Sequence, residues 1–218
     1  MASKWRYGNA WEKFPIAPGE IWGIPDNGSR VAVHNIFDPL PSFMAAADLI
    51  FVDPPWNLGN LNAFYTKAGR ADYQASFEVF ADALFERLGE IELRTCYIEI
   101  GRQWVEDFAA RLGRLYPVVQ RWPVTYYRKF PTWIIRGGST PAWLDLTGID
   151  EAQCIDVIAR CEEYACMGDL CIGQGLVGLA AYGAGRPFVG TELNCRRLAV
   201  LLQKLARRGA QVARYGSA

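Results

Sequence analysis

The sequence predicts an α/β domain in which helices cover both faces of a largely parallel sheet, making three layers. Short apolar, β-branched segments alternate along the chain with longer segments of helical spacing, a pattern typical of parallel strands joined by crossover helices. Two of the apolar segments run directly into glycine or proline turns. The 218 residues, 51% apolar and 21% charged, fit one domain with its own core, so we expect residues 1–218 to form a single domain.

The composition narrows the class of protein. Basic and acidic residues each number 23, and zero net charge argues against a generally basic nucleic-acid coat protein while leaving a local basic patch open. The six cysteines form no C-x-x-C pair and His34 is the one histidine, so we expect no metal site. No secretory signal opens the sequence, and free thiols suit a cytoplasmic protein. The uncharged stretch 170–185 is shorter than a membrane span, so we expect no membrane partner.

The first half of the chain contains three predicted strands. Residues 1–30, with tryptophans among prolines and glycines, are expected to form an N-terminal arm packed over the domain. Apolar, β-branched runs predict strands over residues 30–37, 48–52 and 94–100. Apolar residues at helical spacing predict a helix over 73–88, and the polar, glycine-containing residues 57–72 predict a loop.

The second half continues the alternation and ends in a helix. Strands are predicted over residues 118–127 and 133–136, as a hairpin, and over 170–172 and 188–192. Helices are predicted over residues 105–112, 151–166, 176–182 and 196–207.

A glycine-rich turn follows the strand expected at 170–172. Gly173, Gly175 and Gly178 let the backbone turn tightly and approach a ligand closely. The next predicted strand ends at Glu192, whose carboxylate can accept hydrogen bonds from both hydroxyls of a ribose. The pairing indicates a ligand that carries adenosine, and the alternative is a tight strand–helix turn beside an unrelated acid.

The same glycine spacing also matches a dinucleotide fingerprint, so an NAD-binding oxidoreductase is a rival interpretation. That fingerprint normally begins its domain. Here only one helix and a short tail follow Glu192, so the rest of the sheet must come from upstream, in a permuted order.

A second constellation follows the strand expected at 48–52. Asp53-Pro54-Pro55-Trp56 would lie at the carboxyl end of a parallel strand, beside the ligand crevice. The prolines remove backbone donors, which leaves the Asp53 carboxylate and the Pro54 carbonyl as acceptors. These can hold the two hydrogens of an exocyclic amine, while Trp56 offers a face for a flipped base. The plainer alternative is a Pro-Pro turn that ends a strand.

The chemistry explains why acceptors are needed. The lone pair of an exocyclic amine on a base is delocalised into the ring, which makes the nitrogen a poor nucleophile. Two acceptors favour a pyramidal nitrogen that can attack the methyl group of a sulfonium in line. The protein then supplies position and electrostatics, and no metal is required.

These motifs resemble those of the β-class amino-methyltransferases, in which a catalytic D-P-P-[YFW] motif precedes an F-x-G-x-G loop. The segments carrying the resemblance are 48–59, 169–175 and 186–192, and it extends over roughly residues 30–207. The tryptophan of D-P-P-W also resembles the MT-A70 branch. The resemblance implies a Rossmann-like methyltransferase fold with permuted motif order, and S-adenosyl-L-methionine as cofactor.

The resemblance further implies roles for individual residues. Asp53, Pro54, Pro55 and Trp56 would be catalytic. The cofactor would contact Asn35, Ile36, Asp53, Asp169, Cys171, Gly173, Gln174, Gly175, Glu192 and Leu193. The sequence departs from the family pattern where Leu170 and Cys171 replace Pro-Phe, and where Gln174 replaces a small hydroxyl residue.

The acceptor base and polymer are indicated less directly. In the resembling family an Asp at the first motif position is commoner for adenine N6, which favours adenine in DNA; cytosine N4 and adenine in RNA remain alternatives. Residues 121–150 form a short candidate target-recognition region in which basic and aromatic residues interleave, suiting phosphate contacts and base stacking. The predicted nucleic-acid contacts are Lys67, Arg70, Arg121, Arg128, Lys129 and Arg136.

Further alternatives concern partners and activity. The short recognition region suggests relaxed sequence recognition, a homodimer or a second subunit. A non-catalytic nucleic-acid-binding subunit is also open, although the intact Asp53-Pro54-Pro55-Trp56 favours an enzyme. DNA methylation of the kind found in restriction–modification is implied, but nothing indicates a cognate nuclease. The arginines of the last helix are interpreted as a solvated face, with phosphate contact as the alternative; they are Arg196, Arg197, Arg207 and Arg208.

Overall fold

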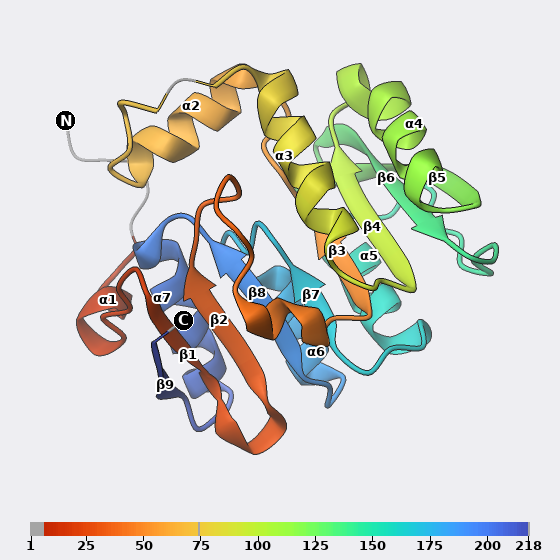
Figure 1. Cartoon of the computed structure of the whole chain (residues 1–218). Helices are drawn as coiled ribbons and strands as arrows, with labels where there is room; N and C mark the ends of the chain where they lie inside the picture. The colour runs from red at the N-terminus through yellow and green to blue at the C-terminus, as the bar shows by residue number, and fades with distance from the viewer. Residues whose placement is uncertain (1–6, 74, 218) are drawn as a thin grey trace.

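The computed structural model describes residues 7–73 and 75–217. This part of the chain forms a nine-stranded sheet in the order β5-β6-β4-β3-β7-β8-β2-β1-β9 (Figure 1). The five central strands are parallel, so their carboxyl ends meet at one edge. They are β4 (Thr95–Ile100), β3 (Leu49–Val52), β7 (Met167–Asp169), β8 (Phe188–Glu192) and β2 (Ser29–Val33).

Antiparallel strands extend the sheet on both sides. On one side β6 (Phe130–Gly138) pairs with β4, and β5 (Val118–Tyr126) pairs with β6 as a hairpin. On the other side β1 (Glu20–Ile24) pairs with both β2 and β9 (Ala213–Ser217).

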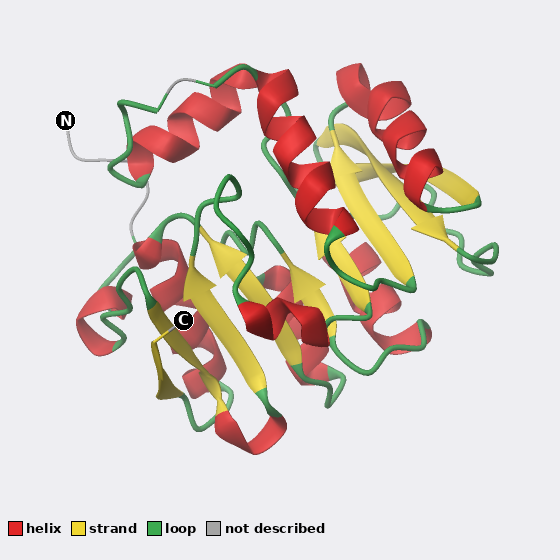
Figure 2. Ribbon diagram, viewed as in Figure 1, coloured by secondary structure: helices red, strands yellow, loops and turns green. Residues whose placement is uncertain are grey.

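Helices cover both faces of the sheet (Figure 2). One face carries α3 (Phe77–Gly89), α4 (Val105–Leu115) and the 3-10 helix η2 (Ser42–Ala46); the other carries α5 (Glu151–Cys161), α6 (Leu176–Gly183) and α7 (Cys195–Arg207). The remaining helices are α1 (Ala10–Lys13), which packs on α7, α2 (Leu58–Lys67), η1 (Pro25–Asn27) and η3 (Arg102–Trp104). The predicted fold class, an α/β domain of three layers with a largely parallel sheet, is confirmed.

The strand β3 explains how one sheet separates two cores. All four of its residues are buried. Leu49 and Phe51 pack into the core beneath α5–α7, whereas Ile50 and Val52 pack into the core beneath α2–α4. Successive side chains of a strand point to opposite faces, so a strand covered on both sides must be apolar throughout.

The segment 57–72 was predicted as a loop, and that prediction is wrong because residues 58–67 form α2. The side chain of Asn57 caps this helix by accepting the backbone N–H of Asn60 at 2.9 Å. Leu61 and Tyr65, four residues apart, bury one face of it. In Figure 1 the helix lies across the carboxyl edge of the sheet, so it can form a wall of a site there.

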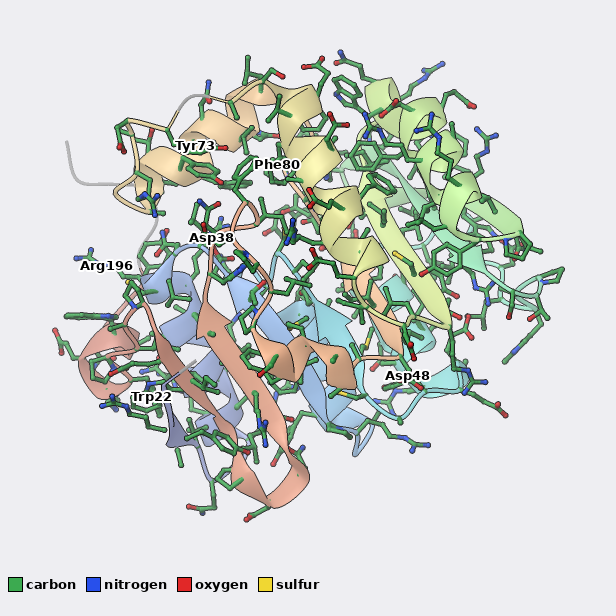
Figure 3. All side chains as sticks on the ribbon, viewed as in Figure 1. Trp22, Asp38, Asp48, Tyr73, Phe80 and Arg196 are labelled. Carbon is green, nitrogen blue, oxygen red and sulfur yellow. The ribbon has the colours of Figure 1, made fainter. Side chains whose placement is uncertain are left out.

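The strand predicted at 170–172 lies three residues earlier, at 167–169. Its place is fixed from outside the segment, because the Asp48 carboxylate accepts the backbone N–H groups of Ala165 and Cys166 at 2.9 Å. Asp48 lies at the amino end of β3, at the edge of the sheet away from α2 (Figure 3). These bonds hold the start of β7 beside β3.

The predicted N-terminal arm is only partly an arm. Residues 20–24 form β1, and residue 29 already belongs to β2, so the end of the segment is built into the sheet. Within the described residues, no helix combines the length and apolar character that crossing a membrane requires.

Candidate active site

A cavity of about 570 Å³ opens at the carboxyl edge of the parallel strands. Its floor includes Asp53 after β3, Asp169 at the end of β7 and Glu192 at the end of β8. One wall comes from α2 and another from the tip of the β5–β6 hairpin. The volume is in the range of small-molecule sites, and a crevice at this edge is where open α/β sheets bind ligands.

The turn after β3 presents a carboxylate to this cavity. Asp53 is half-buried between the buried strand and the buried prolines Pro54 and Pro55. Its Oδ1 accepts a hydrogen bond of 2.9 Å from the indole Nε1 of Trp56. The ring of Trp56 meets that of Tyr126 edge-on, with centroids 5.0 Å apart. The predicted catalytic residues therefore lie together in the cavity, and Trp56 orients Asp53 in addition to lining the wall.

Two further carboxyl groups lie next to Asp53. Glu99 on β4 and Glu151 at the start of α5 each place a carboxylate oxygen so that the three groups lie within 4.8 Å of one another. Burial raises the pKa of Asp53, although the Trp56 hydrogen bond and the Arg197 charge lower it. Burial and the Asp53 charge raise the pKa of both glutamates.

The glycine loop has the conformation that its sequence suggests. Gly173 and Gly175 have φ of 55° and 83°, in the left-handed region that favours glycine. A Cβ on Gly175 would lie 2.5 Å from Leu201 Cδ1, whereas one on Gly173 would have as its nearest neighbour the Cys171 carbonyl oxygen, 3.7 Å away. Gly175 therefore permits packing against α7, and Gly173 leaves room for a ligand.

Glu192 closes the glycine loop from the next strand. It is buried at the cavity wall, and its Oε2 accepts the Gly173 backbone N–H at 2.7 Å while Oε1 accepts that of Asn194 at 2.8 Å. A carboxylate oxygen has more than one lone pair, so each oxygen keeps capacity for a ligand hydroxyl. Burial raises the Glu192 pKa, while Arg197 and the backbone donors lower it.

The other predicted cofactor residues line the same cavity, apart from Gly175, which lies beneath α7. Asn35 is buried, and its side-chain oxygen accepts the Tyr65 hydroxyl at 2.6 Å. The Asp169 carboxylate accepts the Cys171 backbone N–H at 2.8 Å. The cavity lining contains these predicted residues: Asn35, Ile36, Asp53, Asp169, Cys171, Gly173, Gln174, Glu192 and Leu193.

Five of the six predicted nucleic-acid contacts lie at the surface or line the cavity. Arg70, Arg128 and Lys129 are exposed, the last two at the hairpin tip. Lys67 lines the cavity itself, and Arg121 is exposed and forms an ion pair with Glu106.

Arg136 was predicted to contact a nucleic acid, and that prediction is wrong. Its side chain is 4% exposed, and it pairs with Glu162 at 3.1 Å and donates to the Thr140 carbonyl at 2.7 Å. The reason is topological. β6 lies between β4 and β5, so the middle of the hairpin is inside the sheet and its tip alone reaches the cavity.

The fold also brings into the cavity, or next to it, residues that local sequence patterns did not assign to a site. Arg197, predicted on a solvated face, instead lines the cavity with its guanidinium carbon 4.6 Å from the centroid of the Phe64 ring. Glu99 carried a signal, since a glutamate inside the apolar run 95–100 needs an explanation. Glu151 carried none, because its neighbours in the site are distant in sequence. Tyr126 lies in the predicted target-recognition region 121–150, whose aromatic residues suit base stacking.

No protein-family model matches the chain, and no curated protein matches it. Solved structures do resemble it. M1.HpyAVI superposes with a TM-score of 0.56 at 14% identity, covering 80% of this chain and 97% of that one. TTHA0409 from Thermus thermophilus, named as a candidate DNA modification methylase and complexed with S-adenosyl-L-methionine, gives 0.56 at 16%, covering 82% and 93%. At these identities the likeness establishes a shared fold.

Proposed function

We propose that this protein transfers a methyl group from S-adenosyl-L-methionine to the exocyclic amino group of a base in DNA, with adenine N6 as the acceptor. The observation that carries the proposal is a juxtaposition. The acceptor-rich turn beginning at Asp53 and the glycine loop with Glu192 open into one cavity, although more than 100 residues separate them in sequence. An amine clamp beside an adenosine site is the arrangement that this transfer requires.

The site fits the cofactor on its own geometry. The space beside Gly173 permits close approach of a ligand to the backbone, and Glu192 keeps acceptor capacity for ribose hydroxyls. Asp53, Asp169 and Glu192 give the cavity an acidic floor, which suits a cationic ligand. When bound, S-adenosylmethionine supplies an electrophilic methyl group on a positively charged sulfur. The neighbour TTHA0409, solved with this molecule, supports the choice.

In the turn that begins at Asp53, each side chain has a different role towards the base that accepts the methyl group. Asp53 accepts one hydrogen of the amine and holds the nitrogen in a geometry where its lone pair is available. Trp56 fixes the Asp53 carboxylate through the bond to Oδ1. The Trp56 and Tyr126 rings form an aromatic wall against which a flipped base can pack. Position and preorganised charge supply the catalysis.

The hairpin tip supports a polymeric acceptor. Tyr127, Arg128, Lys129 and Phe130 are exposed, and Tyr127 and Phe130 also line the cavity. Basic residues beside aromatic ones suit phosphates that flank an extruded base. Tyr127 and Arg128 both have positive φ, 52° and 54°, a conformation that is uncommon outside glycine and is often found at functional sites.

The deciding experiment identifies which nucleoside receives a tritiated methyl group. Purified protein and tritiated S-adenosylmethionine are incubated with unmethylated DNA and, separately, with RNA, and the digested nucleosides are identified. We expect label in N6-methyldeoxyadenosine, lost in Asp53→Ala. Label in N4-methylcytosine would mean that the acceptor base is cytosine. Label in RNA would mean that the acceptor polymer is RNA. Cofactor binding without transfer would favour a non-catalytic subunit, and binding of a nicotinamide nucleotide instead would favour an oxidoreductase.

A further inference from the structure

The carboxyl group of Glu99 is buried, and its hydrogen-bonding neighbour is another acid, Glu151. The residue is 0% exposed, and among the described residues no amide, hydroxyl or cationic group donates a hydrogen bond to either of its oxygens. An isolated buried carboxylate is costly, so such a group is normally protonated, paired or bound to a cation. Its nearest chemical neighbours are two more acids, Asp53 and Glu151, with oxygens within 4.8 Å.

The surroundings of the three carboxyl groups, Asp53, Glu99 and Glu151 (the carboxyl cluster), are acidic as well. Arg197 on α7 opposes the charge of Asp53, whereas the charged groups that act most strongly on Glu99 are all acids. The other titratable groups facing the carboxyl cluster and its neighbours are Asp150, Asp169, Glu192, Tyr126, Cys154 and Cys171. Like charges at this spacing cannot all ionise together, which points to protons shared within the cluster.

Methyl transfer to an amine creates a need for such a cluster. The nitrogen forms an N–C bond as the sulfur–methyl bond breaks, and one N–H bond must then give up its proton. The proton's closest acceptor in the site is the Asp53 carboxylate, which has to be ionised again before the next turnover. Glu151 lines the same cavity as Asp53, whereas Glu99 is sealed behind them.

We propose that Asp53, Glu99 and Glu151 form a proton-sharing cluster, in which Glu99 stays protonated and Asp53 passes the proton released by the methylated amine to Glu151 and so to solvent. The proton leaves nitrogen as the electron pair of its N–H bond returns to nitrogen, and no oxidant or metal takes part. Glu99 and Glu151 are positioning residues that act through Asp53. This role rests on the proposed function, but the sharing of protons within the cluster does not.

The first test does not depend on activity. The infrared spectrum of a protonated carboxyl group is separate from that of a carboxylate, so the full-length protein is titrated while both bands are recorded. We expect a protonated carboxyl signal at neutral pH that loses intensity in Glu99→Gln and keeps it in Glu78→Gln, an exposed control on α3. An unchanged intensity in Glu99→Gln would contradict a protonated Glu99. Absence of this signal would overturn the proposal, as would a divalent cation retained stoichiometrically by the purified protein.

The second test measures the pH profile of kcat with labelled cofactor and the best acceptor. In the wild type, kcat should fall at low pH as Asp53 becomes protonated. Glu151→Gln removes a neighbouring acid, so the fall should move to lower pH, and the plateau should drop by about tenfold, less than the ~10²-fold or more expected for a group acting directly. Glu151→Asp should restore part of the plateau.

The two tests separate the possible failures. An unchanged profile and plateau in a folded Glu151→Gln variant would overturn the relay. An inactive wild type that still gives the infrared signal would contradict the proposed function and support proton sharing alone. A melting curve of each variant checks that the chain is folded.

Discussion

The indole Nε1 of Trp56 donates a 2.9 Å hydrogen bond to Oδ1 of Asp53, three residues before it in the same turn. The bond stabilises the ionised carboxylate, and so lowers the pKa of Asp53 against the effect of burial. In the proposed function, the second oxygen of this carboxylate is the one that accepts the amine hydrogen. A phenylalanine at this position would have no N–H group to donate to Asp53.

Trp56→Phe should remove this donor while keeping an aromatic ring against Tyr126. A hydrogen bond to a charged group contributes about 1.5–3 kcal/mol, so we expect kcat to fall by about tenfold or more. The low-pH limb of the profile should move to higher pH, because the Asp53 pKa rises further. Trp143→Phe, at a side chain 77% exposed, is the control. Equal kcat in the two variants would remove the role assigned to the indole.

Gly175→Ala should destabilise the fold. The residue has φ of 83°, so an alanine there would strain the backbone. Its Cβ would lie 2.5 Å from Leu201 Cδ1, so it would also overlap that side chain. We expect the free energy of unfolding to fall by about 1–3 kcal/mol, measured by urea denaturation. Gly183→Ala is the matched control, since its Cβ would meet nothing within 4 Å and the position ends α6. It should be neutral or stabilising by up to about 1 kcal/mol; a similar loss in both variants would contradict the packing argument.

The sequence predicted the bounds of a strand correctly where neighbouring residues mark them, and incorrectly where pairing with distant strands sets them. The strand 188–192 was predicted with its observed bounds because local signals mark both ends: Arg186-Pro187 before it, and Glu192 followed by the Asn194 cap after it. β7 was displaced because its apolar run continues past the strand, and its true position depends on pairing with β3 and β8. Because these partner strands are distant in sequence, the residues around β7 do not reveal where it begins and ends.

The same limit applies to the site. Asp53 and Glu192 were predicted because each ends an apolar strand with an acid in a motif. Arg136 was misassigned, since an arginine among aromatic residues has the same local sequence whether Glu162 neutralises it in the interior or it lies at the surface. The carboxyl cluster joins three segments 46 or more residues apart, and only the fold brings them together.

Glu99→Gln should change the pH dependence of stability. Burial raises the pKa of Glu99 in the folded protein, so the folded state holds a proton that the unfolded chain releases above its ordinary pKa of about 4.3. The wild type should therefore lose stability as pH rises from that value towards the folded pKa. The glutamine variant lacks this group, and its melting temperature relative to wild type should rise with pH. A pH-independent difference would mean that Glu99 is ionised in the fold.

Arg197→Met should weaken cofactor binding. The guanidinium lowers the pKa of both Glu192 and Asp53, so its loss leaves these buried groups less ionised and poorer acceptors. We expect the Kd for S-adenosylmethionine, measured by calorimetry, to rise by about tenfold, equivalent to about 1.4 kcal/mol, and to rise more at low pH. Arg196→Met is the control, because Arg196 is exposed at the outer side of α7 (Figure 3). Equal affinity in the two variants would contradict the assignment.

Neutralising the hairpin tip should weaken DNA binding without changing the chemistry. Arg128 and Lys129 are exposed beside the cavity, and each phosphate contact contributes roughly 0.9 to the slope of log K against log salt. In Arg128→Gln/Lys129→Gln the slope should become shallower by about 1–2, while kcat at saturating DNA stays near wild type. Arg114→Gln, exposed near the end of α4 and outside the cavity lining, should leave the slope unchanged. If both variants kept the wild-type slope, the DNA would have to approach from another side, with Lys67 and Arg70 on and beyond α2 as the next residues to neutralise.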